Sequence, residues 1–251
     1  MTQPLPPSIT EKQVKSNYLS LMGQVADTLK RTGRPLDAVQ VIGVTKYVDV
    51  KLTEYLVNAG CHRLAESRPQ ALWAKSAALA DQKIDWHLIG HLQRNKAKKT
   101  VQMLSTMHSL DSDRLLRQIE SDLDPRTSPL QLLLEVNISG DVTKTGISIA
   151  DAELLLTHWM DRDHRPANME IAGLMGMGSL TGSSDTTRRE FSLLRELRDT
   201  WSSRFGLPLT ELSMGMSDDF EIAIEEGSTM VRIGSLLFQQ PEAENEKRTQ
   251  L

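Results

Sequence analysis

Hydrophobic and polar residues follow two periods along this chain. Short apolar, often β-branched runs are typical of buried strands, and segments with apolar residues at steps of three and four lie between them. The clearest helical segment runs from Thr186 to Phe205 and is closed by Gly206 and Pro208. This alternation indicates parallel strands joined by crossover helices. The candidate strands are 39–45, 62–65, 85–90, 106–110, 130–138, 169–175, 209–214 and 229–234.

One more helix is predicted in front of the first strand. Thr10 and Gln13 have the spacing of a capping box, and Gly33 and Pro35 end the segment. Eight βα units in 251 residues match the size of a (β/α)8 TIM barrel. A doubly wound open sheet is the alternative, but such sheets usually carry fewer strands at this length. We therefore expect an α/β protein, a (β/α)8 barrel with an extra N-terminal helix.

The same pattern predicts one domain with two tails. Residues 1–9 are proline-rich and are expected to be flexible, residues 10–240 form the barrel, and residues 241–251 form a polar C-terminal tail. The serine- and threonine-rich segment SLTGSSDTT, 179–187, is expected to be a loop after the sixth strand rather than a linker.

Composition and charge limit the function classes. The net charge of -4 argues against general binding to nucleic acid or a membrane surface. No apolar run approaches the roughly 20 residues that span a bilayer, and MTQPLPPSIT lacks the order of a signal peptide. The single cysteine, Cys61, excludes an internal disulfide and is expected to be a small buried hydrophobe. We expect a cytoplasmic protein.

In a barrel, functional residues gather where the strands end. The first strand ends at Lys46, and a lysine at the barrel mouth can be partly desolvated. Its neutral amine would then attack carbonyl compounds and form Schiff bases. The other interpretation is a solvated charge at a strand end.

The ends of the last two strands point to a phosphate. SMGMSDD (213–219) and RIGS (232–235) carry glycines and hydroxyl groups, and Ser217 is expected to cap the following helix. Main-chain N–H groups, hydroxyls and a helix N-terminus are what a phosphate dianion needs. With Lys46 they predict a phosphate-bearing aldehyde cofactor across the mouth. The alternative is that Gly215 and Gly234 only permit tight turns.

Other candidates are weaker. His87, at the end of the third strand, either packs beside the cofactor or is a structural histidine. His87 and His91 are four residues apart, but Gly90 breaks the helical geometry and no third ligand is present, so we expect no metal site. The run RNKAKK (94–99) is either a phosphate or nucleic-acid patch or, more typically, a solvated helix face. Lys144 is either a transient cofactor residue or a surface lysine.

Six segments are informative together: VIGVTKYVD, WHLIGHLQRNK, EVNISGDVTKTGI, EIAGLMGMG, ELSMGMSDD and GSTMVRIGSLLF. In this order, from about residue 39 to 238, they resemble the pyridoxal phosphate homeostasis proteins of the YggS/PROSC type. The resemblance implies a fold-type III barrel similar to the N-terminal domain of alanine racemase. It also implies that pyridoxal 5'-phosphate (PLP) is held as a Schiff base on Lys46.

The resemblance also implies further cofactor contacts. Arg232 is placed either at the phosphate or at the ring nitrogen. Ser67 stands where the family often has an asparagine, and His91 where it often has a proline. Met175 ends the sixth strand, in a methionine-rich lining of the site. The expected cofactor-binding residues are Lys46, Ser213, Arg232, Gly234, Ser235, Ser67, His87 and Met175.

The expected function is PLP binding in vitamin B6 and amino-acid homeostasis without catalytic turnover. Apo-enzymes that need PLP are the expected recipients, and a monomer is expected because the second domain of the racemases is absent. The alternative is a racemase-like PLP enzyme, but racemisation needs a second base, and Tyr18, Tyr47 and Tyr55 are not obvious candidates. A class I aldolase without cofactor also fits Lys46.

Overall fold

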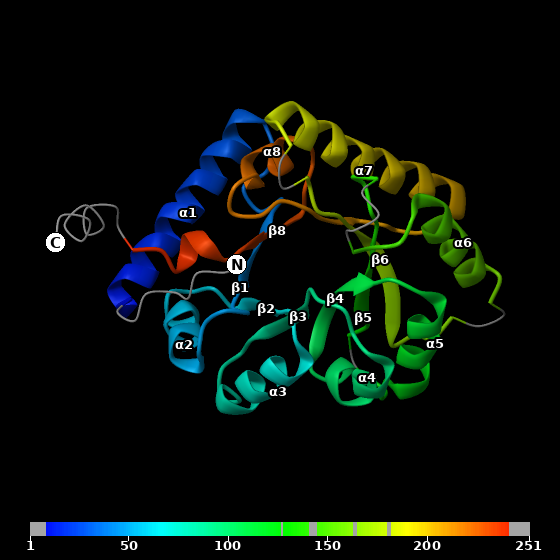
Figure 1. The fold of residues 1–251 in the computed structure, drawn as a ribbon, viewed down its shortest axis with the longest axis horizontal. Helices are drawn as coiled ribbons and strands as arrows, with labels where there is room; N and C mark the ends of the chain where they lie inside the picture. The colour runs from blue at the N-terminus through cyan, green and yellow to red at the C-terminus, as the bar shows by residue number, and fades with distance from the viewer. Residues whose placement is uncertain (1–8, 127, 141–144, 163–164, 180–181, 241–251) are drawn as a thin grey trace.

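A computed structural model describes residues 9–126, 128–140, 145–162, 165–179 and 182–240 of the chain. In these ranges eight parallel strands close into a barrel in sequence order, with helices around it (Figure 1). The expected (β/α)8 barrel is confirmed, and the open doubly wound sheet is excluded because β1 pairs with β8. The strands are β1 (Gln40–Val44), β2 (Arg63–Glu66), β3 (Asp85–Leu88), β4 (Leu104–Leu110), β5 (Leu130–Glu135), β6 (Met169–Met175), β7 (Glu211–Ser213) and β8 (Met230–Ile233).

The helices alternate with the strands as the apolar periodicity predicts. The extra N-terminal helix is present, and a 3-10 turn follows the last strand. The helical elements are α1 (Glu11–Arg31), α2 (Val50–Asn58), α3 (Pro69–Ala78), α4 (Arg94–Val101), α5 (Asp113–Asp122), α6 (Ile149–Met160), α7 (Ser184–Phe205), α8 (Phe220–Glu225) and η1 (Ser235–Leu237).

The barrel has two apolar layers because side chains along each strand alternate between its inside and its outside. One cluster fills the barrel interior, and a larger one lies between the strands and the helices. Burial of these side chains is the main stabilising contribution to the fold. The interior cluster consists of Ile42, Val44, Ala65, Leu133, Ala172, Met175 and Met230.

Several helix ends follow the expected chemistry. Thr10 and Gln13 form the predicted capping box, and Gly206 ends α7 in the left-handed conformation at φ 60°. The segment 179–187 is not wholly a loop, because Ser183 caps α7 and the helix begins at Ser184. Ser183 accepts a hydrogen bond from the N–H of Thr186, which satisfies one of the free donors of the first turn.

Helix α1 takes the place of an eighth outer helix. It packs against α2, α8 and η1, and Figure 1 shows it on the outside of the barrel beside α8. Asn17 donates hydrogen bonds to the carbonyls of Leu237 and Gln239, which fastens α1 to the segment after β8. Ile9 is buried; the rest of the two predicted tails lies outside the described residues. Within the described ranges, no helix has both the length and the apolar character needed to cross a membrane.

Candidate functional site

Lys46 lies two residues beyond β1, at the end of the barrel formed by the C-terminal ends of the strands. Its side chain is exposed, and its Nζ lies 5.0 Å from the centre of the Tyr47 ring. The expected partial desolvation of this amine is therefore wrong for the structure, because the loops around it leave it open to solvent. The amine is accessible to a ligand from outside the barrel.

The main chain directly before Lys46 is held firmly. Thr45 is fully buried, and its N–H donates to the carbonyl of Ala65 on β2 at 3.0 Å. Its hydroxyl donates to Oε1 of Glu66 at 2.7 Å, and its carbonyl accepts from Nζ of Lys75 at 2.7 Å. The exposed side chain of Lys46 thus follows a buried residue whose main chain and hydroxyl are all hydrogen-bonded.

Glu66 and Lys75 form a buried ion pair beneath this strand end. Nζ of Lys75 lies 2.5 Å from Oε1 of Glu66, and both side chains are almost completely shielded from solvent. Oε2 of Glu66 has no hydrogen-bond partner within the described part of the chain. Two opposite charges out of water depend on each other, because either one alone would carry a large desolvation cost.

Arg232 and Ser213 meet inside the barrel. Arg232 Nη1 donates to the carbonyl and to Oγ of Ser213, both at 2.7 Å, and Nη2 donates to the carbonyl of Gly176 at 3.1 Å. Burial lowers the pKa of the Arg232 guanidinium to about 10, while nearby Asp219 and Glu135 oppose this shift. The guanidinium therefore keeps its positive charge at neutral pH.

A chain of hydrogen bonds continues from Ser213 to two buried histidines. Nδ1 of His108 lies 2.7 Å from Oγ of Ser213, and Nε2 of His108 lies 2.8 Å from Nδ1 of His87. Because Arg232 can only donate to Oγ of Ser213, the serine proton is free to point at Nδ1 of His108. His108 then donates through Nε2 to His87, so one direction of donation runs through all four residues.

Both histidines are neutral in this arrangement. Burial, with a smaller effect from Arg63, lowers the pKa of His87 to about 3. Burial, His87 and Arg232 together lower the pKa of His108 well below its ordinary value. The position of His87, 2% exposed and bonded to His108, favours the structural interpretation over packing beside a cofactor.

The loops after β7 and β8 lie against each other, as expected of a phosphate site. The N–H of Arg232 donates to the carbonyl of Gly215 at 2.9 Å, and the N–H of Gly234 donates to Oγ of Ser217 at a long 3.4 Å. Ser217 does not cap α8; Asp219 is the N-cap residue, and its carboxylate accepts from the N–H of Met216 at 2.6 Å.

The two glycines of these loops differ. Gly215 has φ 94°, and a Cβ there would lie 2.5 Å from Cβ of Ala223, so the turn itself requires glycine. Gly234 has a negative φ, and a Cβ there would make only ordinary contacts at 3.5 Å or more. The requirement of a tight turn therefore explains the glycine at 215 but not the one at 234. The main chain at Gly234, next to exposed Ser235, is accessible to a ligand.

The remaining predicted residues lie in different places. Met175 is buried in the interior cluster, and Ser67 is half-buried at a cavity between the loops after β2 and β3. Lys144 lies outside the described residues. Among the described residues, no group of three or more His, Cys, Asp or Glu side chains is arranged to hold a metal ion.

Sequence reasoning misses four polar residues of this end of the barrel: His108, Lys75, Glu135 and Asp219. Burial raises the pKa values of the Glu135 and Asp219 carboxyl groups, and both act on Arg232. Glu135 is the last residue of β5, whereas the predicted strand continues to residue 138 and so hides Glu135 as a strand end. His108 could also be found, because it lies within the predicted strand 106–110.

Fold comparison defines the class of the chain as a barrel like that of the alanine racemases. An alanine racemase of Clostridium difficile 630 matches with a TM-score of 0.64 and 13% identity, over 89% of this chain and 58% of that chain. This distant likeness concerns the fold alone. No protein-family model matches the chain.

Sequence relatives identify the family. A pyridoxal phosphate homeostasis protein of Aquifex aeolicus is 34% identical over 218 residues, 87% of this chain and 94% of the relative. PipY of Synechococcus elongatus, solved with PLP bound, matches with a TM-score of 0.73 and 31% identity, over 86% of this chain and 100% of that chain. The chain belongs to the pyridoxal phosphate homeostasis protein family.

Proposed function

We propose that this protein binds PLP at the mouth of its barrel and holds or delivers it, without catalytic turnover, in vitamin B6 and amino-acid homeostasis. The observation that carries the proposal is the accessible amine of Lys46 at the same end of the barrel as the open loop at Gly234 and Ser235. Family membership supports it, because the relatives carry the name of homeostasis proteins rather than of enzymes.

The residues at the mouth fit the two reactive ends of this cofactor. PLP supplies an aldehyde that bonds to amines and a phosphate dianion that needs several donors. Lys46 provides the amine. The N–H of Gly234, whose bond to Ser217 is long, and the hydroxyl of Ser235, which has no partner in the described ranges, provide donors for the phosphate.

Arg232 and Ser213 support the ring of the cofactor in this proposal. The guanidinium already donates to Ser213 and to Gly176 inside the barrel, so its donors are directed to these residues rather than to the loop at Gly234 and Ser235. A guanidinium that stays charged cannot accept a proton, and it would leave a neighbouring ring nitrogen unprotonated. An unprotonated ring withdraws electrons weakly, which suits a carrier better than an enzyme.

Neither Tyr18 and Tyr47 nor the two buried histidines supply the second base of a racemase. Tyr18 lies in α1, where its hydroxyl donates to the carbonyl of Gly60 at 3.4 Å and burial raises its pKa to about 12. His87 and His108 are buried and bonded to each other. Tyr47 packs on Lys46 itself and so shares its side of the site.

Borohydride reduction tests attachment at Lys46. The purified protein incubated with PLP is expected to turn yellow, and reduction should fix a pyridoxyl phosphate mass on the peptide that contains Lys46. Lys46→Ala should remove the colour and the adduct, whereas Lys51→Ala, which replaces an exposed lysine in the next helix, should keep both. A colourless wild-type protein with no adduct would contradict the proposal and favour the aldolase hypothesis.

Transfer to an apo-enzyme tests the carrier role. PLP should pass from the loaded wild-type protein to an apo-enzyme at least as fast as it does by free diffusion in a mixture with Lys46→Ala, and slower transfer would contradict delivery. Incubation with single amino-acid enantiomers and chiral analysis tests the racemase alternative. We further propose that the protein acts in the cytoplasm as a monomer, in keeping with its single buried cysteine, Cys61; sedimentation analysis tests the oligomeric state.

A further inference from the structure

His108 is a polar side chain in the apolar interior of the barrel. It is fully buried on β4 and reaches across the interior to Ser213 on β7, whereas the interior cluster consists of apolar side chains. An imidazole in such a place costs free energy unless its nitrogens are hydrogen-bonded, and an apolar side chain would fill the same space without that cost. Packing alone therefore does not explain a histidine at this position.

Both ring nitrogens of His108 are in use. Nδ1 lies 2.7 Å from Oγ of Ser213, and Nε2 lies 2.8 Å from Nδ1 of His87. Oγ of Ser213 already accepts from Nη1 of Arg232, so the proton of this hydroxyl can go to His108. His108 is then an acceptor at Nδ1 and a donor at Nε2, and His87 completes the arrangement by accepting at Nδ1.

The neutral state of the two histidines maintains this direction of donation. Burial lowers the pKa of both rings, and at His108 the neighbouring His87 and Arg232 lower the pKa further. A protonated His108 would direct a proton at Ser213 and would bring a second cation close to Arg232. The neutral ring instead takes the serine proton and leaves the guanidinium as the cation of this chain of hydrogen bonds.

The hydroxyl of Ser213 helps to fix the guanidinium of Arg232. Nη1 donates to the carbonyl and to the hydroxyl of Ser213, and Nη2 donates to the carbonyl of Gly176. These three bonds set the plane of the guanidinium and leave further N–H groups of the side chain for a ligand. Without His108 the serine proton loses its acceptor inside the barrel. The hydroxyl would then turn, and Arg232 would lose one of its three bonds.

We infer that His108 is a positioning residue for bound PLP, which acts through Ser213 to hold the guanidinium of Arg232 in the orientation that receives the cofactor ring. The inference rests on the proposed function, in which Arg232 and Ser213 support that ring. His87 contributes by fixing the tautomer of His108. Neither histidine has to touch the cofactor in this arrangement.

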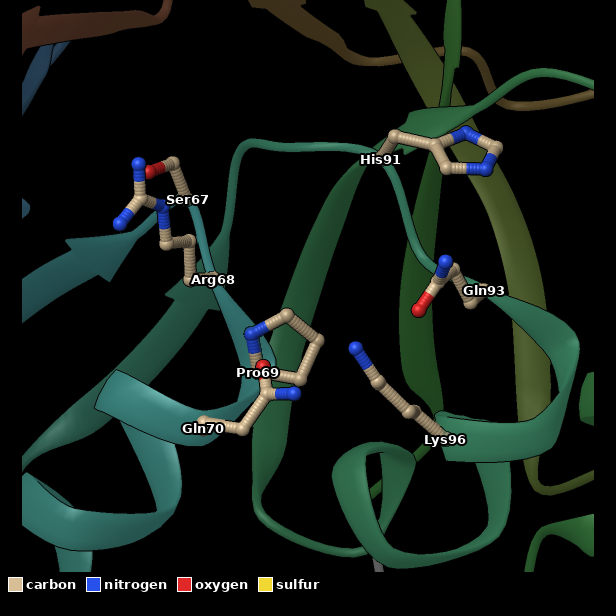
Figure 2. A pocket seen from close by; sticks show the side chains of 7 residues that line it. All are labelled: Ser67, Arg68, Pro69, Gln70, His91, Gln93 and Lys96. Atoms are coloured by element: carbon tan, nitrogen blue, oxygen red, sulfur yellow. The ribbon is translucent and has the colours of Figure 1, made fainter.

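The chain of hydrogen bonds does not extend to the cavity between the loops after β2 and β3. That cavity is lined by residues 67–70, His91, Gln93 and Lys96 (Figure 2). None of the four residues from Arg232 to His87 is part of its lining. A change at His108 is therefore expected to reach the mouth of the barrel through Ser213 and not through the walls of this cavity.

Substitutions of His108 in the full-length protein test the inference. His108→Leu removes both hydrogen bonds with a side chain that suits the apolar interior, whereas the amide of His108→Gln keeps one acceptor and one donor. We expect His108→Leu to raise the dissociation constant for PLP about tenfold. It should also shift the visible absorption and circular dichroism band of the bound cofactor. His108→Gln should keep the band and most of the affinity.

The matched control is Ser109→Ala. Ser109 is also fully buried on β4, but its hydroxyl donates to the carbonyl of Gly90 at 2.8 Å and takes no part in the chain from Arg232 to His87. Chemical denaturation measures the stability of each variant, and Ser109→Ala should change stability without changing the visible band or the dissociation constant. If His108→Leu fails to fold, His87→Leu replaces it, since it removes the partner of Nε2, and the same shift of the band is expected.

The inference is overturned if His108→Leu binds PLP with the affinity and the band of the wild type, or if Ser109→Ala or His108→Gln has an equal effect. A wild type that does not bind PLP is a different result, because it refutes the proposed function and the inference with it. Nitrogen NMR of the cofactor-free protein tests the geometry separately. His108 should carry its proton on Nε2 and not on Nδ1, and the opposite tautomer would overturn the inference even if PLP binds.

Discussion

The ammonium of Lys75 donates a 2.7 Å hydrogen bond to the main-chain carbonyl of Thr45, the residue directly before Lys46. The same ammonium pairs with Glu66 at the end of β2. One buried cation therefore ties helix α3 to the ends of two neighbouring strands, at the point from which the reactive amine extends.

Replacing Lys75 should destabilise the whole barrel. Lys75→Met leaves the Glu66 carboxylate buried without its partner, and we expect the free energy of unfolding to fall by about 3–5 kcal/mol. The double variant Lys75→Met with Glu66→Leu should recover much of this loss. Chemical denaturation measures both, with exposed Lys83→Met as the control. A change within about 1 kcal/mol for the single variant would show that the pair is not coupled as described.

Removing the Ser213 hydroxyl should weaken both stability and PLP binding. Ser213→Ala removes the hydrogen-bond partner of Nδ1 of His108, while Arg232 keeps its bond to the main-chain carbonyl. We expect a loss of about 1–3 kcal/mol in the free energy of unfolding, with a dissociation constant for PLP raised about tenfold. Ser228→Ala, another buried serine bonded only to main-chain carbonyls, should affect stability but not PLP binding. Equal effects of the two variants on PLP binding would contradict a role of Ser213 in the site.

The buried histidines should make the protein sensitive to acid. The pKa of His87 is lowered to about 3 from 6.5, so between these pH values the unfolded chain binds a proton that the folded chain does not. This contribution to stability is present above pH 6.5 and is lost as the pH falls, by about 1.4 kcal/mol per pH unit for each such histidine. His108 acts in the same direction.

Chemical denaturation at several pH values from about 7.5 to about 5 measures how the free energy of unfolding depends on pH. His87→Gln should reduce the pH dependence of the free energy of unfolding by the amount that corresponds to about one bound proton. This holds whatever the variant does to stability at neutral pH. Exposed His62→Gln should leave the slope unchanged. Raised carboxyl pKa values at Glu135 and Asp219 act in the opposite direction, so the informative quantity is the difference between variant and wild type. An unchanged slope in His87→Gln would mean that His87 is not neutral in the folded protein.

Two glycine-to-alanine changes should have opposite effects. A Cβ at Gly90 would lie 2.2 Å from the carbonyl oxygen of Ser67, so Gly90→Ala must move either the loop after β2 or the loop after β3 and should cost about 1–3 kcal/mol. Gly23 lies within α1 with nothing within 4 Å of its Cβ position, and Gly23→Ala should stabilise by about 0.5–1 kcal/mol. Thermal unfolding compares the two, and a neutral Gly90→Ala would show that this close approach is relaxed at little cost.

The sequence predicts the features of this protein that follow from the hydrophobic periodicity of single strands and helices. Strand and helix periods reveal the barrel, and a barrel brings its strand ends together, which by itself singles out Lys46, Ser213 and Arg232 as neighbours at one mouth. The direct bond between Ser213 and Arg232 fits this expectation.

Contacts that depend on packing between elements could not be predicted in this way. His108 reaches Ser213 across the inside of the barrel from β4 to β7, a meeting set by strand tilt and register. Lys75 meets Glu66 only because α3 folds back onto β2. The exposure of Lys46 depends on the loops around it, and Ser217 bonds to Gly234 because the last two loops lie side by side.

The position of α1 also has a consequence for how this protein is made. Asn17 bonds to Leu237, 220 positions further along the chain, and β1 closes the barrel only by pairing with β8. On the ribosome, α1 emerges before α8 and η1, so its contacts with them must wait until those later segments have emerged. Until then part of its apolar stripe, which includes Val14, Leu21 and Val25, stays uncovered. A nascent chain halted before β8 would present that stripe to chaperones, and the barrel could close only once β8 has emerged.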